Sequence, residues 1–154
     1  MKRIAVFGLW TCCTLTISIT SCERSRLTSS SYSGKPTASQ LQKCADLMNL
    51  EFPKGTRGLM FHQKSMLDTV IYLKAEIARD DLEMFLKNLP FVRAELSGVE
   101  KSISPEPELP WWQVDKAESF LSGTAALPDA CWLSILVDLD SPDVCIVYLE
   151  WWDT

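Results

Sequence analysis

The sequence contains a single histidine, His62, so any histidine-dependent catalysis would have to use this residue. One histidine is enough for a Ser-His-Asp or Cys-His site, because the fold and not the sequence brings such partners together. The chain has neither the strained G-x-S-x-G turn of many hydrolases nor a local signature of a nucleophilic cysteine. We therefore interpret His62 as a structural residue among apolar neighbours and predict that the protein is not an enzyme.

Carboxylates near the C-terminus are the best candidates for holding a cation. Asp138, Asp140 and Asp143 surround a predicted turn but lack the glycine and the distant glutamate of a helix-loop-helix calcium loop. Aspartate is also common in turns because it bonds the local backbone, and we favour that reading. No zinc-type spacing of cysteine and histidine occurs, and no glycine-rich phosphate loop. We predict no metal and no other cofactor.

Tryptophan is the least ordinary feature of the sequence. Adjacent residues of a strand point to opposite faces, so Trp151 and Trp152 cannot both enter one core. Exposed tryptophans are typical of sugar, protein or membrane contacts. The exposed reading predicts a binding face made of Trp111, Trp112, Trp151 and Trp152. In the alternative reading, residues 91–128 fold over the second face of the sheet and bury the tryptophan on that face.

Charge is divided unevenly along the chain. Residues 24–99 carry 11 basic and 8 acidic groups, whereas residues 100–154 carry 2 and 11. The acidic half repels phosphate backbones, which excludes nucleic acid as an expected partner. It favours a basic protein partner or a cation-bearing ligand, although acidic surface also simply keeps a small exported domain soluble. Glu106 and Glu108, in a proline-rich stretch, are interpreted as solvated side chains.

The N-terminus has the pattern of a secretory signal. Lys2 and Arg3 precede residues 4–20, which carry no charge, and small residues follow. Ile19-Thr20-Ser21-Cys22 resembles the lipobox of bacterial lipoproteins. The resemblance covers residues 1–22 only and implies cleavage after Ser21 and lipidation of Cys22. It also implies a location in the cell envelope, facing out of the cytoplasm, and in the outer membrane of a diderm host. An uncleaved anchor is the alternative, but 17 residues reach only about 25 Å as a helix.

Three segments follow from this pattern. Residues 1–21 are the predicted signal peptide, and residues 22–39, rich in serine, are a predicted flexible tether. Residues 40–154 have the length of one domain with a single core.

Periodicity predicts the elements of the domain. Leu41, Cys44, Ala45 and Met48 form a helical stripe that Thr37 or Ser39 can cap. Strands are expected at 58–63 and 69–77, followed by a second helix that Asp80 caps and Pro90 ends. Residues 91–110 are ambiguous, a short helix is expected from Asp115 to Gly123, and a hairpin is expected from strands at 131–139 and 144–152.

This order predicts an α+β fold, a two-layer sandwich with helices on one face of a mainly antiparallel four-stranded sheet. The hairpin register places Cys131 more than about 20 Å from Cys145, too far for a disulfide. If a disulfide forms, it is expected between Cys44 and Cys131. The sequence thus predicts a non-catalytic envelope lipoprotein that binds or assembles. The alternative is a periplasmic ligand-binding or inhibitor lipoprotein, with a Trp-rich face for a peptide or glycan.

Overall fold

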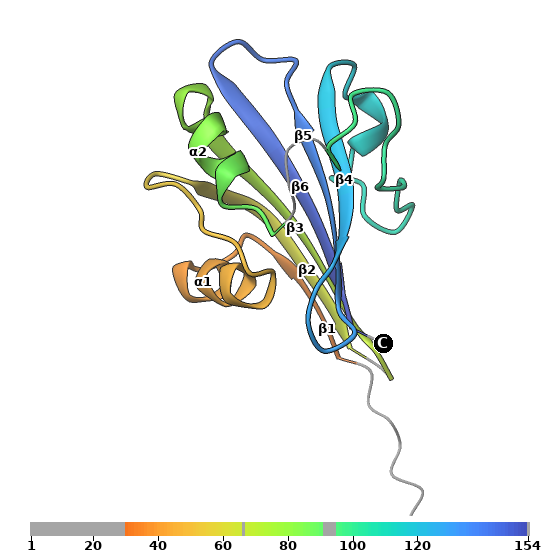
Figure 1. The fold of residues 1–154 in the computed structure, drawn as a ribbon. Helices are drawn as coiled ribbons and strands as arrows, with labels where there is room; N and C mark the ends of the chain where they lie inside the picture. Colours follow the sequence, from red (N-terminus) through yellow and green to blue (C-terminus); the bar gives the residue numbers. More distant parts are fainter. Residues whose placement is uncertain (1–29, 66, 91–94, 154) are drawn as a thin grey trace, which may run out of the picture.

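A computed structural model describes residues 30–65, 67–90 and 95–153. Its centre is one antiparallel sheet of six strands in the order β1-β2-β3-β6-β5-β4 (Figure 1). The α+β class is confirmed, but the predicted number of four strands is wrong. The strands are β1 (Ser30–Gly34), β2 (Arg57–Ser65), β3 (Thr69–Ala78), β4 (Phe120–Ala126), β5 (Trp132–Asp138) and β6 (Val144–Trp152).

Both α-helices lie on the same face of the sheet (Figure 1), α1 at Ala38–Leu47 and α2 at Leu82–Lys87. The apolar stripe of α1 buries Cys44 and Met48, while α2 buries Phe85, as the 3.6-residue period predicts. These side chains join the inward residues of the central strands in one apolar cluster. The strand residues in it include Ile71, Leu73, Ile77, Leu133, Ile135, Val147, Leu149 and Trp151.

The opposite face, which we call the outer face, is covered in part by the connection between residues 95 and 119. Trp112 is the centre of this packing, with its ring 5.2 Å from the rings of both Tyr72 and Tyr148 in edge-to-face geometry. Its indole N–H donates to the carbonyl of Ser104 over 3.2 Å. The described part of the loop therefore buries one region of the second face. The other residues of this second apolar cluster are Ile103, Leu109, Val114, Ala117 and Leu136.

Two segments differ from the sequence prediction. Residues 30–34, assigned to the flexible tether, form β1 and pair with β2 from Ser30↔Ser65 to Gly34↔Phe61. Residues 115–123, expected as a helix, form only a 3-10 turn, η3 (Val114–Lys116), before β4 begins at Phe120. Each new strand occupies one edge of the sheet, where pairing with a neighbour compensates for a weak apolar pattern.

Helix capping follows the prediction at one helix only. The Thr37 hydroxyl accepts the backbone N–H of Gln40, and the Gln40 side chain accepts that of Thr37, which completes a capping box on α1. The expected cap at Asp80 is wrong, because Asp80 lies inside a 3-10 turn, η1 (Arg79–Asp81), and α2 starts without a side-chain cap. Among the described residues, no helix is long and apolar enough to cross a membrane.

Candidate functional site

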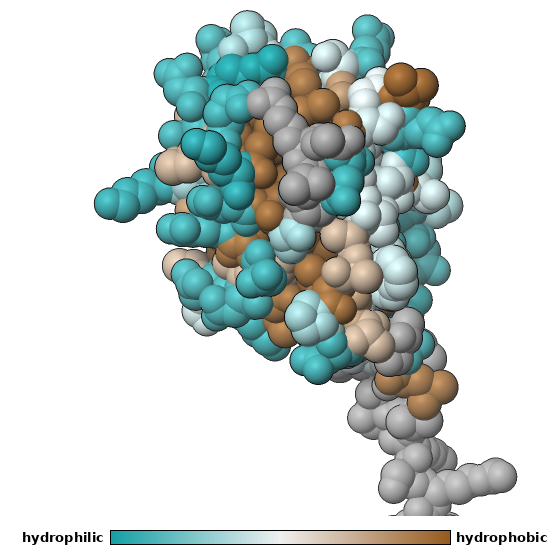
Figure 2. All heavy atoms as spheres, in the orientation of Figure 1, coloured by the Kyte–Doolittle hydropathy of each residue, from teal (hydrophilic) through white to brown (hydrophobic). Residues whose placement is uncertain are grey.

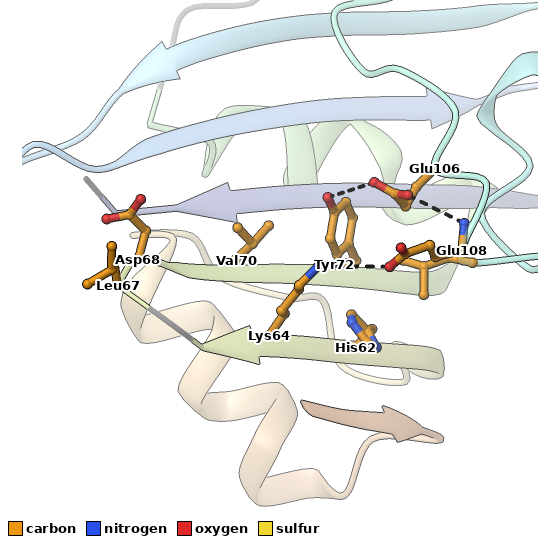
Figure 3. A pocket seen from close by; sticks show the side chains of 9 residues that line it. His62, Lys64, Leu67, Asp68, Val70, Tyr72, Glu106 and Glu108 are labelled. Atoms are coloured by element: carbon orange, nitrogen blue, oxygen red, sulfur yellow. Dashed lines mark hydrogen bonds and ion pairs between the residues drawn. The ribbon is translucent and has the colours of Figure 1, made fainter. Parts of the chain in front are cut away.

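A pocket lies on the outer face of the sheet, between β2, β3 and the loop at residues 106–109. Its volume is about 370 Å³. Figure 3 shows Glu106 and Glu108 reaching from the loop toward Tyr72 and Lys64 on the strands. Three apolar side chains form part of its wall and charged groups line the rest. The lining residues are His62, Lys64, Leu67, Asp68, Val70, Tyr72, Glu106, Glu108 and Leu109.

Sheet register explains why the strand residues share this face. His62 is directly opposite Tyr72, and Tyr72 is directly opposite Glu150 on β6. Side chains that are opposite in an antiparallel ladder point to the same side of the sheet. Lys64 and Val70 form the next pair on this side, two residues further along. The alternation that buries Leu73 and Ile71 among the helices therefore presents these residues to the loop.

Tyr72 connects the floor of the pocket to the loop. Its hydroxyl donates a hydrogen bond to Glu106 Oε2 over 3.4 Å (Figure 3). Burial raises the pKa of Tyr72, and the neighbouring carboxylates of Glu150 and Glu106 raise it further, so the phenol remains protonated and able to donate. The hydroxyl therefore stays a hydrogen-bond donor beside the carboxylates of Glu106 and Glu150.

Among the described residues, no side chain orients the ring of His62 as the carboxylate of a catalytic triad would. Its Nδ1 is buried and has no hydrogen-bond partner among the described residues. In a Ser-His-Asp triad that nitrogen donates to a carboxylate, which holds the ring in position. Burial lowers the pKa of His62, and the charge of Lys64 lowers it further, so the neutral form predominates at pH 7.

Negative charge predominates around the pocket. Lys64 Nζ is 3.8 Å from Glu108 Oε2, but both side chains are exposed, at 49% and 78%, so the pair is weak. Asp68 and Glu106 are further carboxylates of the lining. With His62 neutral, the lining therefore has one positive and three negative groups.

Glu150 lies behind Tyr72 on the same face of the sheet. Burial raises the pKa of its carboxyl group above the ordinary 4.5; the nearby Tyr72 hydroxyl opposes this shift, and the charge of Glu106 adds to it. Glu150 itself does not line the pocket.

The tryptophans predicted as a binding face are not exposed together. Trp112 is 3% exposed in the loop-covered cluster, and Trp151 is 5% exposed on the helix side of the sheet. Trp111 and Trp152 are half-buried. Trp111 packs edge-on against Trp112, with ring centres 5.6 Å apart, and Trp152 is on the outer face opposite Val70. The four tryptophans therefore do not form one exposed face in the structure, because strand alternation and the loop bury Trp151 and Trp112.

The remaining predicted sites are placed as follows. Cys22 lies outside the described residues. Cys44, Cys131 and Cys145 are free thiols in the structure, and the Cys44–Cys131 disulfide stays a prediction. Asp140 accepts the backbone N–H groups of Glu118 and Ser119, which holds its carboxylate at the turn and lowers its pKa. Within the described ranges, no three His, Cys, Asp or Glu side chains gather as metal ligands.

Sequence reasoning missed most of the pocket. Glu106 and Glu108, expected to be solvated, lie beside Tyr72 and Lys64, and nothing in the local sequence pattern predicts that position. The period-2 pattern of residues 69–77 does put Val70 and Tyr72 on the face opposite the core, and this was the available signal. Comparison of the chain with protein-family models, with curated proteins and with solved structures found no match.

Proposed function

We propose that this chain is a non-catalytic cell-envelope lipoprotein, anchored through Cys22, whose domain binds a ligand with a positive charge on an apolar body. The lipobox-like N-terminus supports the anchor and the address. The helical layer on one face, in the manner of a two-layer sandwich, leaves the outer face for binding. The pocket between β2, β3 and the loop is the proposed site.

The composition of the pocket wall is the observation that carries this proposal. Leu67, Val70 and Leu109 offer apolar surface, while Glu106 and Glu108 stand at the loop side. Apolar surface supplies most of the binding free energy in such a pocket, and a few polar groups determine orientation. A pocket of about 370 Å³ is at the small end of ligand sites, so it suits one side chain or a small amine.

Charge selects the sign of the ligand. The lining has three carboxylates and one ammonium group, Lys64, so it attracts a cation and repels an anion. The Tyr72 hydroxyl donates its proton to Glu106 and does not offer it to an anionic ligand. An ammonium group could replace Lys64 beside Glu108, since the existing pair is 3.8 Å apart and exposed. A lysine side chain of a partner protein and a free aliphatic or aromatic amine share this chemistry.

The single histidine gives a direct test. In the mature lipidated protein in detergent, the ring of His62 produces one set of histidine signals in NMR spectra. We expect phenethylammonium to shift these signals saturably at pH 7, whereas neutral 2-phenylethanol shifts them less. A blocked Leu-Lys dipeptide tests the protein-derived source of the same ammonium group. Replacement of Glu106 and Glu108 together by glutamine should weaken phenethylammonium binding by roughly 3- to 10-fold.

Glu118→Gln is the matched control, since Glu118 is exposed, carries the same charge and lies outside the pocket. It should leave the titration unchanged. Equal shifts from the charged and neutral probes, or no effect of the double Glu106/Glu108 variant, would refute selection by charge.

A further inference from the structure

Exposed apolar side chains gather at one end of the sheet. Trp132 on β5 is directly opposite Trp152 on β6, and Trp152 is directly opposite Val70 on β3. Opposite residues share a face, so the two indoles are neighbours on the outer face. Trp132 is 41% exposed, and Leu67, in the turn between β2 and β3, is 82% exposed. We call Leu67, Trp132 and Trp152 the Trp end of the sheet.

The chain enters the fold at this same end. Ser30, the first described residue, pairs with Ser65 beside the turn that carries Leu67. Figure 1 shows the start of β1 and the C-terminus together at this end of the sheet. In the space-filling view, hydrophobic surface is visible at this end of the molecule (Figure 2).

Covalent geometry limits the distance from this end to Cys22. Eight residue steps separate Cys22 from Ser30. A fully extended chain covers at most 3.3–3.6 Å per residue, so this segment spans roughly 26–29 Å at most. A lipidated Cys22 therefore keeps the start of β1 within that distance of the bilayer, which is less than the usual diameter of a domain of this size. Of the two ends of the sheet, the Trp end is the one nearer to the membrane.

The side chains at this end suit a membrane interface. Tryptophan is enriched at the headgroup level of bilayers, where an apolar ring with a polar N–H is favourable. Charged groups beside the patch include Lys64 and three aspartates, so attraction to anionic lipid is not the driving force. The aspartates are Asp68, Asp129 and Asp153.

We propose that the Trp end of the sheet docks on the surface of the bilayer that holds Cys22, with Leu67 and Trp132 at the headgroup level. This inference rests on the lipidation in the proposed function and not on the ligand of the pocket; Leu67 belongs both to the pocket wall and to the Trp end. The occupant of the patch is a zwitterionic lipid surface, reached without a second protein. The short link from Cys22 to Ser30 orients the domain, and the apolar side chains of the Trp end hold that orientation.

Two exposed aliphatic residues provide a matched test. Leu67 is 82% exposed at the Trp end, whereas Val99 is 88% exposed near β4, where Ser97 bridges Ser122. Ala126 on β4 is the partner of Trp132 on β5. Ser122 is four residues before Ala126, so it lies about 13 Å along β4 from the Trp end. In the test, either Leu67 or Val99 is replaced by tryptophan in the mature lipidated protein. The protein is placed in vesicles of ordinary or dibrominated phosphatidylcholine.

Brominated chains quench nearby indoles, so Leu67→Trp should lose a measurable part of its added emission in the brominated vesicles, because its ring would lie at the interface. Val99→Trp should keep its added emission, and Trp132→Phe should reduce the quenchable part of the wild-type signal. Equal quenching of both added tryptophans, or none at Leu67→Trp in a protein shown by mass spectrometry to be acylated, would overturn the docking alone. An unacylated mature protein would overturn the lipoprotein assignment and this inference together, while the His62 titration would still report on the pocket.

Discussion

The hydroxyl of Tyr72 donates to Glu106 over 3.4 Å and joins β3 to a loop residue 34 positions later in the chain. Around this bond the Trp112 ring packs edge-on to Tyr72, with ring centres 5.2 Å apart. The two contacts attach the loop to the outer face and create the roof of the pocket. Removal of the hydrogen bond therefore affects stability and the pocket together.

Tyr72→Phe should destabilise the domain by about 0.5–1.5 kcal/mol, because the half-buried Glu106 loses its donor while the aromatic packing is kept. Chemical denaturation of the two proteins under identical conditions measures this difference. Tyr32→Phe is the control, since Tyr32 is 47% exposed and its loss of a hydroxyl should be nearly neutral. Equal stabilities of Tyr72→Phe and wild type would contradict the role of this bond.

Gly58 is required by close packing with Pro36. A Cβ at position 58 would overlap the Pro36 ring, which belongs to the connection between β1 and α1. Gly58→Ala should therefore cost about 1–3 kcal/mol in the free energy of unfolding. The double variant Pro36→Ala/Gly58→Ala should recover part of that loss, because the overlapping ring is gone. Additive effects in this double-mutant cycle would show that the two residues do not clash.

The strands with strong alternation were predictable, and the edge strands were not. The alternation of residues 69–77 and 131–139 predicts β3 and β5, and the hairpin turn at 140–143 predicts β6; all three strands are confirmed. β1 has the serine-rich composition of a tether, and only its pairing with β2 makes it a strand. β4 contains Gly123 and small residues, and its structure depends on β5. Sequence periodicity reports burial along one element and carries no signal for such pairing.

The candidate site shows the same limit. The face on which Tyr72 and Val70 lie follows from the alternation, but the loop that completes the pocket has no period. Glu106 reaches Tyr72 because Leu109 and Trp112 pack into the outer cluster, a tertiary contact that fixes the path of the loop. For the same reason the sequence did not reveal which tryptophans are buried.

Thiol labelling tests the state of the cysteines. Cys44 and Cys145 are fully buried and Cys131 is half-buried, so native protein at pH 8 should react with Ellman's reagent at one thiol. Burial also raises the pKa of Cys44 to about 12, which leaves little thiolate to react. In denaturant the mature lipidated protein should show three thiols. A count of one would instead demonstrate a disulfide, and peptide mapping would identify its partners.

The half-buried carboxyl group of Glu150 should make stability depend on pH. Burial raises its pKa in the folded state above the ordinary 4.5, so the folded protein holds this proton more tightly than the unfolded chain. The resulting stabilisation is fully present below pH 4.5 and is lost as pH rises through the folded-state pKa. Above that pH a charged group remains half-buried beside Tyr72 and near Glu106.

Glu150→Gln removes this titration while keeping the shape and a polar group beside Tyr72. The variant should be more stable than wild type at pH 7.5 and close to it at pH 4, as measured by chemical denaturation at both values. Glu118→Gln, which changes the same charge at an exposed position, should show no such difference between the two pH values. If Glu150→Gln loses stability at pH 7.5, the ionised carboxylate is favoured in the fold, and its interaction with Tyr72 outweighs the cost of its burial.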